Sequence, residues 1–329
     1  MKSTKEQFLQ LLHAPDKTSM AVALEMMKGM SPTVLEEYLK EYRVVYEFFV
    51  REKWEIQKID FFTQDKVDLS GYLECLDEEI SNIPVELGHL KYIQYLDLSS
   101  NDFTTLPESL GQLQKLQTLV LSYNQLAKLP ESLGQLSQLK NLYLDKNHLE
   151  SLPKSLTNLR YLAHLALDSN QLRSLPDNIG QLKNLQGLTL NFNQLSYLPE
   201  SIGQLEQLQK LYLYANSIKK LPRPISNLTQ LRHLDFSGNG LTELPAEVLQ
   251  LTKLNTLHLT QNRLTHLPEE ISQLTELSTL YLDQNQLTHL PESFQQLDKL
   301  LYLYINNNPI NDLEKEKIKS WLPKCYITF

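Results

Sequence analysis

The sequence predicts an α/β solenoid, a column of short parallel strands joined by return segments, and three observations carry this prediction. Asparagine occupies every twenty-third position from Asn101 to Asn308. Proline recurs with the same period from Pro84 to Pro291. Between them leucine occupies alternate positions, the pattern of a β-strand with one buried face. A fixed period of this length is the signature of a repeat architecture.

Each unit follows the pattern LxxLxLxxNxLxxLPxxLxxL, as in residues 116–136. The L-x-L segment predicts a short strand, and strands of successive units are expected to stack in parallel about 4.8 Å apart. The asparagine amide both donates and accepts, so we expect the asparagine column to satisfy buried backbone groups where the chain turns. Proline and the following glutamate predict the start of a return segment that is either extended or a helical turn.

The repeat resembles that of leucine-rich repeat proteins. Its LPxSLGQLxxL half is similar to the 23-residue subclass found in bacterial repeat proteins and in Ras-associated intracellular scaffolds. The resemblance covers residues 69–309, as one degenerate and ten regular repeats. It implies a leucine-rich-repeat horseshoe with the parallel β-sheet on its concave side.

The segment before the repeats has a different texture. Residues 1–68 predict a helical N-terminal region that either caps the array or forms an interaction module. Ser3 and Glu6 form a capping-box pattern at its first helix, and Ser31-Pro32 is a start signal for a later one. Counting back one period from the first regular repeat places a degenerate strand at residues 72–74, with Cys75 in a core position.

Residues 310–329 predict a C-terminal cap. Asn311-Asp312-Leu313-Glu314 opens a helix that Pro323 ends. Beyond it Cys325, Ile327 and Phe329 alternate like a final strand on the last repeat. A solenoid needs such caps because each end exposes an apolar cross-section.

Composition narrows the classes of function. The net charge of −8 lacks the basic footprint of a nucleic-acid binder. The two cysteines lie far apart without metal-ligand spacing, and the sequence shows neither a secretory signal nor a membrane span. We therefore expect a cytoplasmic, monomeric protein that needs no cofactor, and the resemblance to bacterial repeat proteins implies a bacterial one. Because the sequence carries no catalytic motif, we expect no enzymatic activity.

Function is expected at the variable strand positions, which lie six, four, two and one residues before each asparagine. These are four of the 23 positions in a repeat, yet they hold nine of the 16 tyrosines. The nine are Tyr72, Tyr95, Tyr123, Tyr143, Tyr212, Tyr214, Tyr281, Tyr302 and Tyr304. Exposed amphipathic aromatics are typical of protein-recognition surfaces. Stacking of tyrosine on tyrosine without a partner is the plainer alternative.

The sequence thus predicts a protein-binding scaffold that uses its concave face. The candidate partner-binding residues are Tyr95, Tyr123, Tyr143, His164, Phe192, Lys210, Tyr212, Tyr214, His233, Asp235, His258, Tyr281, Asp283, Tyr302 and Tyr304. The strand at residues 210–214 is expected at the centre, since it alone has tyrosine at both middle positions. A receptor for a small glycan or lipid at the Tyr/His/Asp patch is the alternative. Asp235 and His258 should stack, but loose geometry between adjacent strands argues against a metal site.

Overall fold

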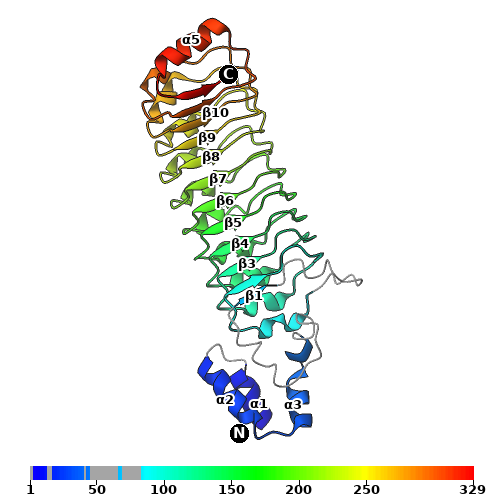
Figure 1. Ribbon diagram of the computed structural model, residues 1–329. Coiled ribbons are helices and arrows are strands. Elements are labelled where there is room, and N and C mark those ends of the chain that lie inside the picture. The colour runs from blue at the N-terminus through cyan, green and yellow to red at the C-terminus, as the bar shows by residue number, and fades with distance from the viewer. Residues whose placement is uncertain (1–2, 13–16, 41, 45–65, 69–82) are drawn as a thin grey trace. The chain divides into compact units, whose positions relative to one another are not determined.

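The computed structural model describes residues 3–12, 17–40, 42–44, 66–68 and 83–329 (Figure 1). The chain divides into two compact units, Met1–Leu149 with Pro153–Leu162 and Glu150–Leu152 with Ala163–Phe329. Both units contain 23-residue repeats, with the leucines on one side of a parallel sheet. The predicted α/β solenoid is confirmed.

The described part of the first unit contains strands that pair in parallel in chain order. They are β1 (Lys66–Asp68), β2 (Tyr95–Asp97), β3 (Thr118–Val120) and β4 (Asn141–Tyr143). The return segments form 3-10 helices, namely η3 (Val85–His89), η4 (Glu108–Gln112), η5 (Glu131–Gln135) and η6 (Lys154–Asn158).

The second unit continues the same pattern, and Figure 1 shows its strands side by side in chain order. Its strands are β5 (His164–Ala166), β6 (Gly187–Thr189), β7 (Lys210–Tyr212), β8 (His233–Asp235), β9 (Thr256–His258), β10 (Thr279–Tyr281), β11 (Tyr302–Tyr304) and β12 (Tyr326–Thr328). Its 3-10 helices are η7 (Ile179–Gln181), η8 (Glu200–Gln204), η9 (Arg223–Asn227), η10 (Ala246–Gln250), η11 (Glu269–Gln273) and η12 (Glu292–Gln296).

The strand that pairs with β2 is not the one that the repeat period predicts. Lys66 pairs with Tyr95, so the interval between these two strands is longer than the repeat period, which would have paired Tyr72 with Tyr95. The neighbour predicted at residues 72–74 is therefore wrong, and β1 takes its place in the sheet. The degenerate repeat and Cys75 lie outside the described residues, and the domain boundaries stay predictions.

The asparagine column has the structural role that its chemistry predicts. Asn193 donates through Nδ2 to the carbonyl of Leu190 in its own repeat (3.1 Å) and to that of Leu167 in the preceding repeat (2.9 Å). Its Oδ1 accepts from the backbone N–H of Leu172 at 3.0 Å. One buried amide thus satisfies three backbone groups and connects neighbouring repeats.

The prolines stand one residue outside the return helices. Pro107 and Pro199 have extended backbone (ψ 148° and 149°) and act as N-caps, so that the 3-10 helix begins at the following glutamate. Glu108 also accepts from the backbone N–H of Ser132 in the next repeat, at 3.1 Å. A proline ring suits this extended position because it lacks an N–H and has a fixed φ.

The N-terminal helices are α1 (Thr4–Leu12), α2 (Lys17–Met27) and α3 (Pro32–Tyr38). The predicted capping box is confirmed: the Ser3 N–H donates to the Glu6 carboxylate at 2.7 Å, and the Glu6 N–H donates to Ser3 Oγ at 3.2 Å. The ring of Tyr42, beyond α3, is buried and stacks on His89 in η3, with centroids 4.7 Å apart.

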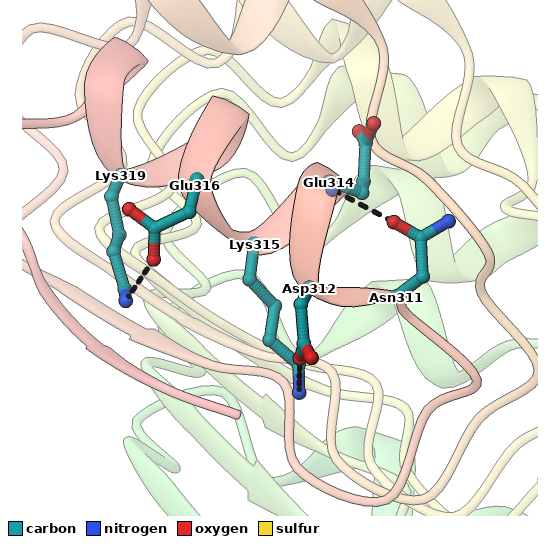
Figure 2. Close-up of polar contacts among 6 residues, drawn as sticks. All are labelled: Asn311, Asp312, Glu314, Lys315, Glu316 and Lys319. Carbon is teal, nitrogen blue, oxygen red and sulfur yellow. Dashed lines mark hydrogen bonds and ion pairs between the residues drawn. The ribbon is translucent and has the colours of Figure 1, made fainter.

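The C-terminal cap is a helix followed by a strand, as predicted. Helix α5 (Asp312–Trp321) begins after Asn311, whose Oδ1 accepts from the Glu314 N–H at 2.9 Å (Figure 2). Exposed ion pairs follow along the same helix, including Lys315 with Asp312. Strand β12 pairs with β11. Burial raises the pKa of the adjoining Cys325 thiol to about 11, so the thiol stays protonated at neutral pH.

Candidate partner-binding surface

The solvent-facing side of the sheet and the bends that follow its strands, termed together the strand face, carry every residue that the sequence assigned to partner binding. In the first unit these are Tyr95, Tyr123 and Tyr143. Tyr95 donates its hydroxyl to Asp97 Oδ2 at 3.0 Å, and Lys66 Nζ lies 4.8 Å from the Tyr95 ring centroid. Tyr123 is 52% exposed, and Lys146 Nζ lies 4.3 Å from the centroid of its ring.

In the second unit a row of parallel rings crosses three strands. His258 in β9 stacks on Tyr281 in β10, with centroids 4.1 Å apart and planes at 7°. Tyr281 stacks in turn on Tyr304 in β11, at 4.6 Å and 4°. The spacing of parallel strands, about 4.8 Å, places these rings at stacking distance. The row ends at β12, where Thr328 is the register partner of Tyr304.

A second aromatic group surrounds Tyr214. Its hydroxyl donates to Gln261 Oε1 at 3.0 Å, across a separation of 47 residues. Its ring lies against Gly238, where an added Cβ would approach Cε2 of the ring to 2.9 Å. Phe192 meets the same ring edge-on, with centroids 4.8 Å apart at 80°. Tyr214 therefore lies along the sheet in a fixed orientation, because one end is hydrogen-bonded and a glycine makes room beneath it.

Phe192 is 53% exposed and has a positive φ of 53°. The residue before each repeat asparagine shares this left-handed conformation, as Tyr123 (φ 58°) and Ala215 (φ 54°) do. The cost for an L-residue there is about 1–2 kcal/mol, and bulky side chains are rare in this region. Sheet hydrogen bonds impose the conformation, since the Phe192 N–H donates to the Tyr214 carbonyl at 2.8 Å. A large exposed ring adds nothing to that bond.

Hydrogen bonds between neighbouring strands order the polar part of the face. Asp168 accepts from the Asn191 backbone N–H at 2.7 Å, and Asn191 Oδ1 accepts from the Tyr214 N–H at 2.8 Å. The same arrangement recurs at Asp283, whose Oδ1 accepts from the Asn306 N–H at 2.8 Å. At these two places an aspartate therefore pairs with the asparagine of the next strand.

Burial disfavours the charged form of two histidines of the face, His233 and His258. Burial lowers the pKa of His258, although the Asp235 carboxylate, its register partner in β8, acts in the opposite direction. Burial also lowers the pKa of His233, and the positive charges of Lys210 and Arg232 add to this effect. Burial raises the pKa of Tyr212, with the negative charge of Asp235 as the second cause.

The remaining predicted residues lie on the same face of the second unit. His164 and Lys210 are exposed, and Gly187 gives room to the His164 ring, whose Nδ1 would lie 2.9 Å from an added Cβ. Tyr302 is exposed and makes an edge contact with Tyr326, with centroids 6.4 Å apart.

Three residues that belong to this surface were not predicted. Tyr326 is 60% exposed and is the register partner of Tyr302. The sequence could have indicated Tyr326, because Cys325 and Ile327 on either side of it were predicted to face inward and Tyr326 must then face outward. Gly238 and Gln261 hold Tyr214 in place, and no local sequence pattern connects either residue to that ring.

A depression of about 540 Å³ lies off the strand face, near Tyr197, Glu200 and Lys220 at the start of the return segments. Among the described residues no three His, Cys, Asp or Glu side chains gather as a metal site would require. No helix in the described ranges is long and apolar enough to cross a bilayer. The strand face offers rings, carboxylates and amides on a sheet, which suits recognition by surface contact.

Comparison with known sequences defines the class of protein. Residues 68–169 match the family described as leucine-rich repeat region. Residues 160–218, 184–241, 229–287 and 252–310 match the family described as leucine rich repeat. These matches span more than half of the chain, which therefore belongs to the leucine-rich repeat family. A search of curated protein sequences finds no match.

Three solved structures illustrate the likeness. A leucine-rich repeat protein of Leptospira interrogans is 33% identical, covers 85% of this chain and 94% of its own, and has a TM-score of 0.44. The ectodomain of the Arabidopsis thaliana receptor kinase GASSHO1/SCHENGEN3, in complex with CASPARIAN STRIP INTEGRITY FACTOR 2, is 33% identical over 72% of this chain and 30% of its own (TM-score 0.64). The plant peptide hormone receptor RGFR1, in complex with RGF2, is 29% identical over 69% and 42% (TM-score 0.59). This chain spans less than half of either receptor.

Proposed function

We propose that this protein is a non-enzymatic scaffold that binds another protein through the strand face of its second unit, centred on β6–β11. Leucine-rich repeat domains generally mediate protein–protein interaction, and the two plant receptors described above are in complexes. The observation that carries the proposal is the set formed by Phe192, Tyr214, Gly238 and Gln261.

These four residues hold two aromatic rings at the surface at some cost to the fold. Phe192 occupies a left-handed conformation that a bulky side chain disfavours, and the residue is 53% exposed. Tyr214 is oriented by a hydrogen bond and by a glycine that removes a clash. Rigid aromatic anchors lose little conformational entropy on binding, so pre-organisation of this kind favours affinity. The positive φ itself recurs in every regular repeat, so the feature particular to residue 192 is the large exposed ring that occupies this position.

The row His258–Tyr281–Tyr304 extends the surface towards β11. A protein partner of standard size covers about 800 Å² on each side, which requires several repeats. The face from Phe192 in β6's repeat to Tyr304 in β11 supplies such a stretch within one unit. A cytoplasmic location, a monomeric state and the absence of nucleic-acid binding stay predictions from composition.

The test is affinity capture with a variant in which Tyr212, Tyr214 and Tyr281 are replaced by alanine. We expect the captured partner to be lost, because aromatic anchors can each contribute about 2 kcal/mol or more of binding, roughly 30-fold in affinity. The matched control replaces Tyr161 and Tyr197, which are 56% and 50% exposed but lie off the strand face, and it should keep the partner. Retention of the same partners by the triple variant would refute the proposal.

A further inference from the structure

The charges of the strand face are unevenly distributed. From β8 to β12 the outward positions carry the carboxylates of Asp235 and Asp283 and no lysine or arginine. The two histidines in this stretch are His233 and His258, whose pKa values burial lowers, so that neither adds positive charge at pH 7. This part of the face is therefore acidic and aromatic, and the cationic side chains of Lys210 and Arg232 lie at its β8 edge, where their charges act on His233.

Register places the two carboxylates on either side of small side chains. Asp235 in β8 is aligned with His258 in β9. Asp283 follows Tyr281 by two residues and leaves the sheet on the same side, about 7 Å further along the chain. Ser237 and Thr260 occupy the corresponding positions after β8 and β9, between the two carboxylates, and Ser237 is buried.

Each carboxylate has one oxygen engaged by the fold. Asp235 Oδ1 accepts from the Ser237 N–H at 2.9 Å, and Asp283 Oδ1 accepts from the Asn306 N–H at 2.8 Å. Within the described residues no group donates to Oδ2 of either aspartate. The fold thus fixes the position of both carboxylates and leaves one acceptor on each for a ligand.

We propose that Asp235, His258, Tyr281 and Asp283, together with the fixed ring of Tyr214, form a recognition surface for an arginine-containing segment of the protein partner, with a separate arginine at each carboxylate. This inference rests on the proposed function, which it narrows to a partner with a basic segment. A guanidinium group matches the requirement, because it is planar, weakly hydrated, always charged and able to pair with a carboxylate while it donates to neighbouring acceptors such as tyrosine hydroxyls. Charge complementarity of this kind also speeds association and excludes acidic partners.

The test measures the affinity of the full chain for a fluorescein-labelled peptide of alternating arginine and serine, by fluorescence anisotropy at low salt. Citrulline, which keeps the shape of arginine without the charge, replaces arginine in a second peptide. We expect binding of the arginine peptide and at least a roughly tenfold weaker affinity for the citrulline peptide, an effect of about the size that two partly exposed ion pairs and ring contacts allow.

The decisive variant is Asp235→Asn with Asp283→Asn. Asparagine keeps the Oδ1 acceptor that the backbone uses, so the melting temperature should stay within a few degrees of wild type. We expect affinity for the arginine peptide to fall about tenfold. The matched control is Asp145→Asn with Asp168→Asn, which removes the same charge from the same face away from the ring row; it should change affinity less than about twofold.

Three results would overturn the inference: no binding of the arginine peptide, equal binding of the citrulline peptide, or equal losses in the two double variants. The capture experiment separates this inference from the proposed function. If the tyrosine variant loses the partner and the Asp235/Asp283 variant keeps it, the arginine site is refuted and the strand-face proposal stands. If the tyrosine variant keeps the partner, the proposed function itself is refuted.

Discussion

The two sides of residues 210–214, the segment that contains β7, follow opposite rules. On the inner side Leu211 and Leu213 are fully buried, and the same positions hold leucine or a close equivalent in each regular repeat. On the outer side, no other repeat carries the combination of Lys210, Tyr212 and Tyr214. The inner side repeats because every repeat must bury the same area and satisfy the same backbone groups. On the outer side only some residues, such as Asp168 and Asn191, satisfy backbone groups, so the variable aromatic residues there are the candidates for a functional role.

The largest difference is expected between two adjacent residues on opposite sides of β7. Leu211→Ala should lower the free energy of unfolding by about 2–5 kcal/mol, because it leaves a cavity in a closely packed core. Tyr212→Ala should cost less than about 1 kcal/mol, since the side chain is only partly buried. Urea unfolding of both variants measures the contrast. Similar losses would show that the strand face is part of the stabilising core.

The asparagine column gives the next effect. Asn193→Leu should destabilise the protein by about 1–3 kcal/mol, because the Leu167 and Leu190 carbonyls and the Leu172 N–H lose their buried partner. Gln194→Leu, at the exposed neighbouring position, is the control and should change stability by less than about 0.5 kcal/mol. A melting curve of Asn193→Leu that coincides with wild type would contradict the structural role.

A smaller change in stability is expected from the positive φ at residue 192. Phe192→Asn and Phe192→Val both remove the ring contact with Tyr214, but asparagine tolerates a positive φ and a β-branched side chain does not. We expect the valine variant to be less stable than the asparagine variant by about 1 kcal/mol, measured by thermal unfolding. Equal stability would mean that residue 192 does not hold the left-handed conformation in solution.

The smallest expected effect is a dependence of stability on pH. Burial lowers the pKa of His258 below its unfolded value of about 6.5, so the unfolded state binds a proton more readily. Stability is therefore lost as the pH falls below that unfolded value. Asp235 of β8 and Tyr281 of β10 face the imidazole, and the Asp235 charge limits the loss.

The His258→Gln variant should accordingly lose less stability than wild type between pH 7 and pH 5.5, as measured by urea unfolding. Both proteins contain the same carboxylates, so the difference in stability loss between them reports the histidine alone. If the two proteins lose the same stability over this range, burial of His258 has no thermodynamic effect.

Much of the fold follows from the sequence because one physical requirement is repeated. Each repeat buries two carbonyls and an N–H at its turn and therefore needs an asparagine amide such as that of Asn193. The constant spacing of these asparagines predicts the sheet, its register and its interior. The capping box at Ser3 and the N-cap at Asn311 were equally readable, since both depend on side chains close together in the chain. The pairing of Lys66 with Tyr95 was not, because the period fails at the end of the array.

The sequence also predicts which residues lie on the strand face, because they recur at fixed positions of the repeat. It does not predict the contacts among them. Tyr214 could be placed on the face by counting, but its contact with Gln261 is made 47 residues away and depends on a glycine between them. The left-handed column was also hidden, because Phe192, Tyr123 and Ala215 have no local preference for positive φ. There, hydrogen bonds to the next repeat override the preference of the individual residue.

The measurement that tests the central claim most directly is site-specific photocrosslinking in native lysate. A benzoylphenylalanine residue replaces Tyr281 on the strand face in one protein and Tyr197 off that face in another. Because both positions are tyrosines of the second unit, the two proteins differ chiefly in the surface they probe. The account predicts a protein adduct from position 281 and none of the same mass from position 197. No adduct from position 281, or the same adduct from position 197 alone, would contradict it.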